Sequence, residues 1–203
     1  MMIDSNDLLN SILQSIEEMD YVRLEDIPNI DLYMDQVTTF MEEQMKENKR
    51  YPEDKVLTKT MINNYAKNHL LPAPIKKKYS KEHILTLIYI YYLKNILSIK
   101  DIETLLKPLT EQYFSTEGAY GFEEIYKQIC ELEKSKIDTL KADVEQSYHQ
   151  TETLFGEAED EQQKYLQLFA FICSLGFDVY VKKLLIEKLV DEIAPDEQGK
   201  KKK

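Results

Sequence analysis

The chain has 203 residues, of which 43% are hydrophobic and 31% are charged, and its formal net charge is −11. This composition is typical of a foldable globular protein and excludes an intrinsically disordered one. The acidity disfavours nucleic-acid binding by the protein as a whole, so such binding would need a locally basic segment. Five glycines and six prolines are few for this length, which favours long helices joined by few turns.

Neither a targeting signal nor a membrane span is indicated. The first twenty residues carry acids where a secretory signal has basic residues, and they contain no long apolar run. The longest apolar run, residues 84–93, is shorter than the roughly 20 residues that cross a bilayer. Cys130 and Cys173 stand far apart, which indicates neither a disulfide framework nor a zinc site. We expect a cytoplasmic protein without a metal or cofactor.

Two helices are predicted in the first fifty residues. Residues 4–19 repeat apolar side chains at helical spacing, and Pro28 follows in a break. A second helix is predicted over residues 32–47, and its apolar face is expected to consist of Tyr33, Val37, Phe40 and Met41. Residues 46–55 are charged and contain a proline, which is typical of an exposed loop.

Three further helices are predicted before residue 109. Thr58 can cap a short helix that ends near Asn68, after which Pro72 and Pro74 exclude helix. Ser80 can cap a helix over residues 81–97, which is apolar nearly all round and is therefore expected at the centre of a domain. A capping box of Ser98 and Asp101 predicts another helix, ending before Pro108.

The C-terminal half is also expected to be helical. Residues 122–148 form an imperfect heptad pattern typical of one long helix, and Gly176 is expected to divide the last apolar block, residues 165–193, into two helices. The second of these carries an apolar stripe that needs a partner surface: Val181, Leu184, Leu185 and Leu189. The fold class is therefore all-α. The predicted parts are an N-terminal helix (1–27), a central domain (28–109), a helical dimerisation region (110–194) and a disordered tail (195–203).

One segment is basic although the protein is acidic. Residues 55–81 contain seven lysines and no Asp or Glu, so the rest of the chain must carry −18 to give −11. On the short helix, Lys59, Asn63 and Lys67 form one row at a spacing of four, and Thr60 and Asn64 form the neighbouring row. The opposite side is suited to packing, with the side chains of Ile62, Tyr65, Ala66 and Leu70.

These side chains suit a DNA groove. An Asn amide can donate to and accept from the edge of adenine, and lysines neutralise phosphates. The loop that contains Pro72 and Pro74 would present Lys76, Lys77 and Lys78 beside the helix, as in proteins where a helix reads bases and a basic loop holds the backbone. The alternative interpretation is a solvated charged face without a nucleic-acid partner.

The segment "MINNYAKNHLLP", followed by "KKYSKEHILTLIYIYYL", resembles the DNA-binding head of the mercury-resistance-regulator (MerR) type, a winged helix-turn-helix. Tyr65, the Leu70–Leu71–Pro72 run and the Lys77, Tyr79, Ser80 group occupy the positions of its recognition helix and wing. Asn63 stands where such heads usually have an Arg, and His69 stands where they have a Gly. Residues 26–109, which include "IPNIDLYMDQVTTFMEEQM", resemble more closely a bacterial family called domain of unknown function 1836.

The resemblance implies a MerR-like head with a small β wing and a DNA-binding transcriptional regulator that acts as a homodimer on double-stranded DNA. The residues expected to contact DNA are Lys59, Thr60, Asn63, Asn64, Lys67, Lys76, Lys77, Lys78 and Tyr79. Tyr65 and Tyr79 would position the head, by packing or by a hydroxyl contact.

Two other classes of function were weighed on the same residues. One is a protein-interaction scaffold with a degenerate head and a partner-binding C-terminal half. The other is an enzyme, which is not expected because His69, His83 and His149 share no ligand spacing and no phosphate-binding glycine loop is present. The pattern identifies no small-molecule effector.

Overall fold

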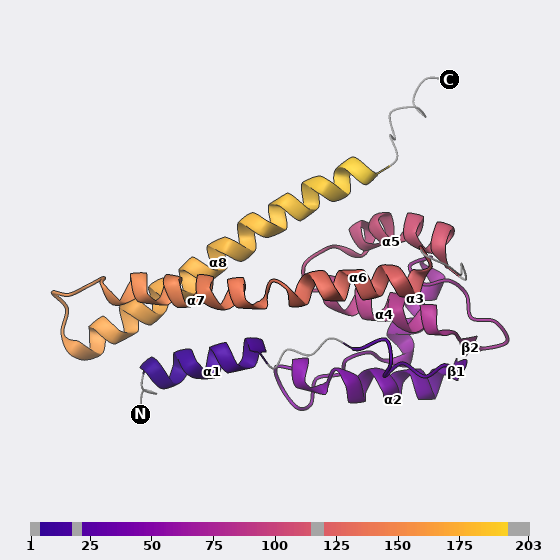
Figure 1. The fold of residues 1–203 in the computed structure, drawn as a ribbon, viewed down its shortest axis with the longest axis horizontal. Coiled ribbons are helices and arrows are strands. Elements are labelled where there is room, and N and C mark those ends of the chain that lie inside the picture. Colours follow the sequence, from indigo (N-terminus) through magenta and orange to yellow (C-terminus); the bar gives the residue numbers. More distant parts are fainter. Residues whose placement is uncertain (1–4, 18–21, 115–119, 195–203) are drawn as a thin grey trace, which may run out of the picture. The chain divides into compact units, whose positions relative to one another are not determined.

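The computed structural model describes residues 5–17, 22–114 and 120–194 (Figure 1). Within these ranges the chain is mainly helical, with one sheet of two short strands, which confirms the all-α class. The tail predicted to be disordered, 195–203, lies outside the described residues. The elements are α1 (Ser5–Glu17), β1 (Leu32–Tyr33), α2 (Met34–Gln44), the short 3-10 helix η1 (Lys46–Asn48), α3 (Lys59–Lys67), β2 (Lys78–Tyr79), α4 (Lys81–Leu93), α5 (Ile99–Tyr113), α6 (Phe122–Lys134), α7 (Ile137–Glu152) and α8 (Asp160–Ile193).

The chain is organised into two compact units. Unit 1 combines residues 1–20 with 130–185, and unit 2 combines residues 21–129 with 186–203. The two units are defined by which residues pack together. The domain boundaries predicted from the sequence, at residues 27 and 109, concern where independently folding parts meet, and they stay predictions.

Helix α4 forms the centre of unit 2. Its side chains are buried on every side, and Leu85, Leu87 and Ile90 are each 0% exposed. The buried hydroxyl of Thr86 on this helix donates to the carbonyl of Glu82 at 2.8 Å, which gives this polar group a partner inside the core. Burying one such Leu or Ile contributes about 1.5–3 kcal/mol. The central position predicted for this helix is confirmed.

The start of α6 closes unit 2. The hydroxyl of Tyr126 is buried and donates to the carbonyl of Val22 at 2.7 Å, joining residues 104 positions apart. The ring of Tyr89 on α4 makes edge contacts with Phe122 and Tyr126. Lys81 adds an ion pair to Glu123 at 3.1 Å. Residues well beyond 109 are therefore part of the same packed core.

Helix α3 has the ends that its sequence predicts. The Thr58 hydroxyl accepts from the backbone N–H of Met61 at 3.2 Å. At the other end, the Leu70 N–H donates to the backbone carbonyl of Tyr65 at 2.9 Å, and the His69 N–H donates to the backbone carbonyl of Ala66 at 3.3 Å. This pair of bonds is the Schellman pattern. His69 occupies the left-handed position of that pattern, with φ of 58°. Glycine is usual there because it has no Cβ to strain.

The two strands are antiparallel, with Leu32 opposite Tyr79 and Tyr33 opposite Lys78 (Figure 1). An isolated bridge between Ile75 and Lys78 closes a tight turn just before β2. Both central residues of this turn have positive φ, 50° at Lys76 and 65° at Lys77. Such turns normally hold Asn and Gly. The absence of helix predicted after Pro72 is confirmed.

Several predicted helix ends in unit 2 were wrong. Leu32 and Tyr33 pair as a strand, so α2 begins at Met34, and it gives way to η1 after Gln44. Helix α4 ends at Leu93, followed by turn-type bonds to its last carbonyls. Helix α5 continues through Pro108, which removes one backbone N–H, and it ends at Tyr113, where the C-cap residue Phe114 donates to the Thr110 carbonyl.

The long helices of the C-terminal half also differ from expectation. The helix predicted over 122–148 is interrupted at Ser135, whose hydroxyl donates to the Leu132 carbonyl at 2.6 Å, and α7 follows as a separate helix. Helix α8 runs without a break through Gly176. A glycine inside a helix costs only about 1 kcal/mol, which is too little to divide a helix of 34 residues.

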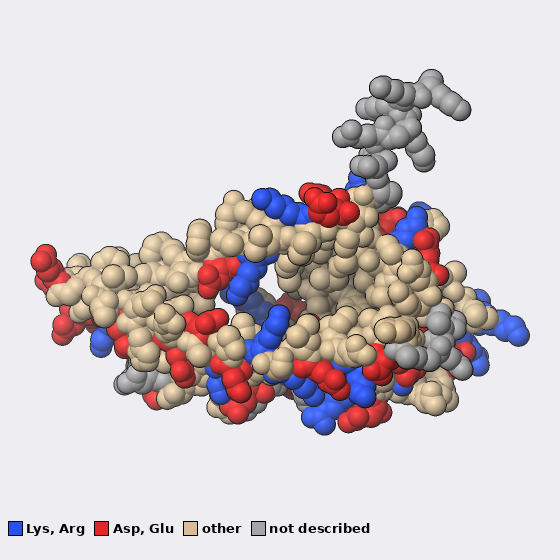
Figure 2. All heavy atoms as spheres, turned by 45° about the horizontal axis from the view of Figure 1, so that its top comes forward, with Lys and Arg blue, Asp and Glu red and all other residues tan. Residues whose placement is uncertain are grey.

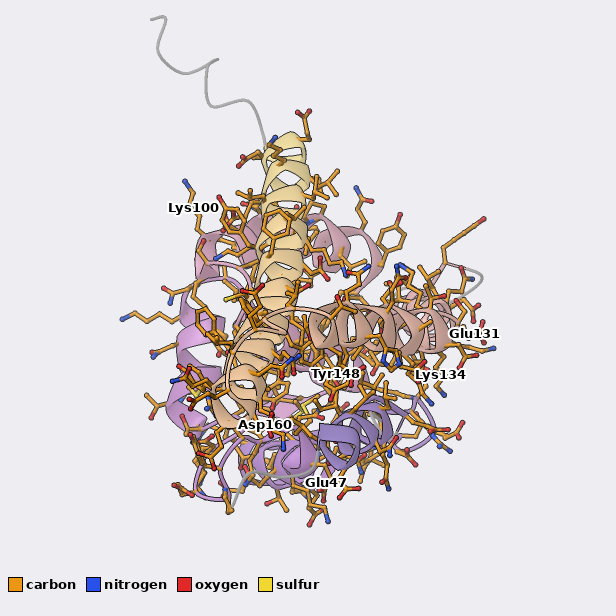
Figure 3. The ribbon with its side chains drawn as sticks, turned by 90° about the vertical axis from the view of Figure 1, so that its left-hand side faces the viewer. Glu47, Lys100, Glu131, Lys134, Tyr148 and Asp160 are labelled. Atoms are coloured by element: carbon orange, nitrogen blue, oxygen red, sulfur yellow. The ribbon has the colours of Figure 1, made fainter. Side chains whose placement is uncertain are left out.

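Unit 1 has a small core. Leu9 of α1, Tyr148 of α7 and Phe171 of α8 are its buried cluster among the described residues, and the two rings meet edge-on at 5.4 Å. Figure 3 labels Tyr148 where α7 and α8 meet. The Gln167 side chain donates to the carbonyls of Glu152 and Leu154, which satisfies the end of α7. Lys141 pairs with Glu17 at 3.1 Å and links α7 to α1.

His83 is a buried titratable group at the start of α4, 2% exposed. Its Nδ1 accepts from the Ser80 N–H at 2.9 Å, completing a capping box, and its ring lies against Tyr79 and Phe114. Burial lowers the pKa of His83 from its ordinary value of 6.5, since the charged ring would lose its hydration.

Replacing His69 with glycine is expected to stabilise the protein by about 0.5–1 kcal/mol. Glycine removes the strain of the left-handed conformation, which stabilises the folded state. Its greater conformational freedom in the unfolded chain offsets part of that gain. Chemical denaturation of His69→Gly measures it. The matched control is Asn68→Gly, where φ is −94° and the same substitution should destabilise. A loss of stability in both variants would contradict the assigned backbone conformation.

Stability is expected to fall with acidification below pH 6.5 because of His83. Its folded pKa is lower than its unfolded pKa, so the unfolded chain takes up more protons there. This contribution is complete above pH 6.5 and is lost as pH falls toward the folded pKa. His83→Gln keeps a capping-box residue without the titration, so its free energy of unfolding should depend less on pH between about 6.5 and 5.5. Equal slopes for the two proteins would refute this role.

Candidate functional site

Helix α3 has two faces of opposite character. Ile62 is 0% exposed and Tyr65 is 7% exposed, and Ala66 beside them is half-buried. Burial raises the pKa of the Tyr65 hydroxyl. The other face is open to solvent and carries the side chains expected to contact DNA on this helix: Lys59, Thr60, Asn63, Asn64 and Lys67. The helix itself contains no carboxylate.

The loop between α2 and α3 is bound to two elements of unit 2, helix α2 and the end of helix α4. The Glu42 carboxylate binds Lys49 Nζ at 2.6 Å and accepts from the Val56 N–H at 3.2 Å. The hydrogen bond from Lys49 and the bond from Val56 lower the pKa of Glu42, although burial opposes them. From the end of α4, Lys94 Nζ donates to the Val56 carbonyl at 3.0 Å. Burial lowers the pKa of Lys94.

This loop therefore holds the start of α3 in place. The sequence predicts an exposed loop over residues 46–55 but does not indicate the two contacts that hold it. A half-buried Glu–Lys pair seven residues apart gives little signal in a sequence, because surface pairs at many spacings look alike.

The basic turn presents its lysines in different ways. Lys76 and Lys77 at its tip are exposed. Lys78 is half-buried, and its Nζ lies 5.4 Å from the centre of the Tyr33 ring, its partner in the sheet. Tyr79 is 3% exposed, and its ring contacts His83, so the structure places it as a packing residue.

One of the expected DNA contacts has an acidic partner. Lys59 forms an ion pair with Asp35 of α2, and both side chains are largely exposed. The segment lacks acids in sequence, but α2 supplies one in space. In the part of the chain that the structure describes, no carboxylate pairs with Lys67, Lys76 or Lys77. Figure 2 shows acidic and basic side chains intermixed over the face that it presents.

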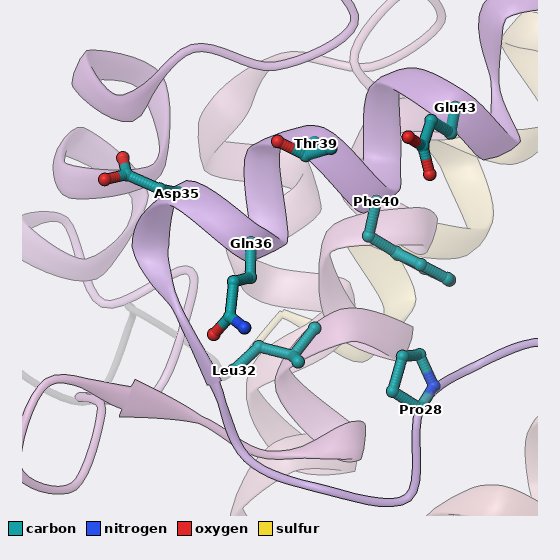
Figure 4. A pocket seen from close by; sticks show the side chains of 7 residues that line it. All are labelled: Pro28, Leu32, Asp35, Gln36, Thr39, Phe40 and Glu43. Atoms are coloured by element: carbon teal, nitrogen blue, oxygen red, sulfur yellow. The ribbon is translucent and has the colours of Figure 1, made fainter.

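Helix α2 brings the candidate residues together, because it contacts both α3 and β2. Its outer side carries an open hollow (Figure 4). Leu32, Phe40 and Pro28 give the hollow an apolar floor, and four polar residues complete the lining: Asp35, Gln36, Thr39 and Glu43. Its two carboxylates make it unsuited to phosphate.

Two other kinds of site were sought. Over residues 5–17, 22–114 and 120–194, no three His, Cys, Asp or Glu side chains gather as a metal site would require. Within the same ranges, no helix is both long enough and apolar enough to cross a bilayer.

No curated protein and no solved structure matches the chain. One protein-family model does match, over residues 22–129. This range is more than half of the chain and follows the main segment of unit 2, 21–129. It begins at the residue whose carbonyl accepts from Tyr126, and it contains α3, the basic turn and the hollow. The chain belongs to the family described as Domain of unknown function (DUF1836).

Proposed function

We propose that this protein is a DNA-binding transcriptional regulator, without enzymatic activity, whose residues 28–109 form a MerR-like winged helix-turn-helix. Helix α3 would enter the major groove, and the turn Ile75–Lys78 would lie on the flanking backbone as a short wing. The observation that carries the proposal is the division of α3, which is anchored by Ile62 and Tyr65 and displays amides, a hydroxyl and ammonium groups on its free face. That chemistry suits base edges and phosphates.

Each exposed residue has a role in this proposal. Asn63 and Asn64 read bases, assisted by Thr60. Lys67, Lys76 and Lys77 hold phosphates. Lys59 exchanges Asp35 for a phosphate oxygen when DNA binds, which is inexpensive because exposed ion pairs contribute only about 0–1 kcal/mol. Lys78 is steadied by Tyr33, and Tyr79 supports the turn from within.

Two backbone features support the MerR-like assignment. His69 has the left-handed conformation that glycine adopts most readily, and it stands where MerR-type heads have glycine. The antiparallel pair of β1 and β2, with its tight turn, supplies a small β element where those heads have a wing.

The turn carries backbone strain at two successive residues. A left-handed residue other than glycine costs about 1–2 kcal/mol, and two lysines in succession adopt it here. Residues held in such conformations cluster at functional sites. The cost is consistent with selection for charge at the tip of the turn.

A second candidate is a protein-interaction scaffold. It is favoured by the open hollow on α2, whose apolar floor and acidic rim suit a peptide with basic and apolar side chains, and by the ion pair that occupies Lys59. A titration with DNA separates the two candidates.

The protein is expected to bind a mixed-sequence duplex of about 20 base pairs at low salt, with affinity that falls steeply as salt rises. Lys76→Ala/Lys77→Ala should reduce the slope of log K against log salt by about 1.8, since each lost phosphate contact contributes about 0.9. Fluorescence anisotropy measures the slope. Lys107→Ala on α5, an exposed lysine outside the basic segment, is the matched control and should leave it unchanged. No binding at micromolar protein would favour the scaffold.

Relieving the strain in the turn is expected to raise the stability of the protein and to lower its affinity for DNA. Lys76→Asn/Lys77→Gly supplies the residues that such turns prefer, so the protein should gain about 1 kcal/mol while DNA affinity falls. Lys76→Ala/Lys77→Ala removes the same charges but keeps both Cβ atoms, so it should lose affinity without that gain. Thermal denaturation and the DNA titration, run on both variants, measure the two effects. Unchanged affinity in either variant would exclude the turn from the interface.

A further inference from the structure

Helix α8 displays an unusually large apolar surface for a small unit. Unit 1 buries only Leu9, Tyr148 and Phe171 as a hydrophobic cluster among its described residues. Over the same unit, α8 leaves large apolar side chains exposed: Tyr165, Leu168, Phe169, Ile172, Phe177, Val179, Tyr180, Val181, Leu184 and Leu185. Large exposed apolar areas of this kind mark interaction surfaces.

Part of this surface has a regular pattern. Tyr165, Phe169, Ile172, Gly176 and Val179 follow one another at spacings of four and three, the repeat by which two helices pack along a seam. The four side chains of this α8 seam are 63%, 54%, 58% and 65% exposed. Apart from the adjacent residues and the backbone of α8 itself, no atom lies within 4 Å of a Cβ placed at Gly176, so the seam is open at its centre as well.

The α8 seam does not face the core of unit 1. Phe171 and Leu175 face that core, and the seam lies roughly a third of a turn around the helix from them at about 100° per residue. Residues 165–177 contain no charged side chain, so the seam offers nothing to a phosphate or to a charged peptide. In Figure 2 the visible charged side chains of α8 gather toward its C-terminal end. The partner must itself be apolar.

The charges at the two ends of the seam favour a second copy in the opposite direction. Glu161 and Lys183 stand eleven residues before and after Ile172, on the same side of the helix as the seam. In an antiparallel pair centred on Ile172, each Glu161 meets the Lys183 of the other copy. In a parallel pair, Glu161 would meet Glu161 and Lys183 would meet Lys183, which is repulsive.

The same pairing fits the shape of the seam. Centred on Ile172, it places Gly176 opposite Leu168, so the missing side chain on one helix accommodates a large one on the other. We propose that the α8 seam is a homodimer interface, in which two copies of α8 pack antiparallel about a two-fold axis at Ile172. This surface differs from the stripe of Val181, Leu184, Leu185 and Leu189 that the sequence indicated, and it lies outside the matched family range.

The interface is tested by the mass of the full chain in solution. Sedimentation equilibrium at micromolar concentration should give the mass of two chains for the natural protein. Ile172→Lys should weaken association at least 100-fold and give one chain. The matched control, Leu185→Lys, changes a residue that is 56% exposed on another side of α8 and should remain dimeric. A single-chain mass for the natural protein, or equal dissociation of both variants, would overturn the proposal.

The direction of the pair is tested by exchanging charges. Glu161→Lys and Lys183→Glu should each weaken association about tenfold, and the double variant should restore it, because only the antiparallel pair brings these positions together. Helical circular dichroism equal to that of the natural protein shows that the variants fold. A double variant as weak as the single ones would exclude the antiparallel arrangement. DNA is absent throughout, so this result is independent of the proposed regulatory function.

Discussion

The burial of α4 on every side is the constraint on which unit 2 depends. A helix without a polar face is stable in water only when neighbours surround it. Here β2 and α5 contact α4, and rings of α6 and Phe114 pack against Tyr89 and His83. The helices before and after α4 in sequence must therefore fold together. This accounts for a family domain that reaches residue 129 and ends just beyond the bond from Tyr126 to Val22.

The candidate DNA interface on α3 is connected to the core around α4 through the loop between α2 and α3. Lys94 follows α4 and holds the Val56 carbonyl, while Glu42 of α2 holds the N–H of the same residue. One peptide segment is thus tied to two elements, two residues before the cap of α3. An exposed binding face needs such support, because the free energy of ordering a loop would otherwise be subtracted from that of binding. The hydrogen bonds that join Glu42 and Lys94 to Val56 therefore hold α3 in position, as does the burial of its apolar face.

The parts of this fold that sequence could predict are those governed by adjacent residues. Thr58 and Ser98 begin helices because their hydroxyls reach backbone donors three positions on, and α4 is central because its own composition leaves no solvent face. Two of the errors gave too much weight to single residues: Pro108 does not end α5, and Gly176 does not divide α8. A third error concerns a contact between residues that are distant in sequence. The pair of Asp35 with Lys59 joins positions on different helices, so a count of charges along the basic segment could not include it.

The proposed homodimer and the proposed DNA binding together require a symmetric DNA target. An antiparallel pair of identical helices is necessarily related by a two-fold axis, so each copy presents the same surface to the other. Any DNA element read by both copies would then have to be an inverted repeat, because a two-fold dimer places its recognition helices in inverted orientation. Two lysine turns would double the number of phosphate contacts, and the salt dependence with it. For an acidic chain this matters, since one basic segment alone must overcome the repulsion from the rest of the chain, whose net charge is −18.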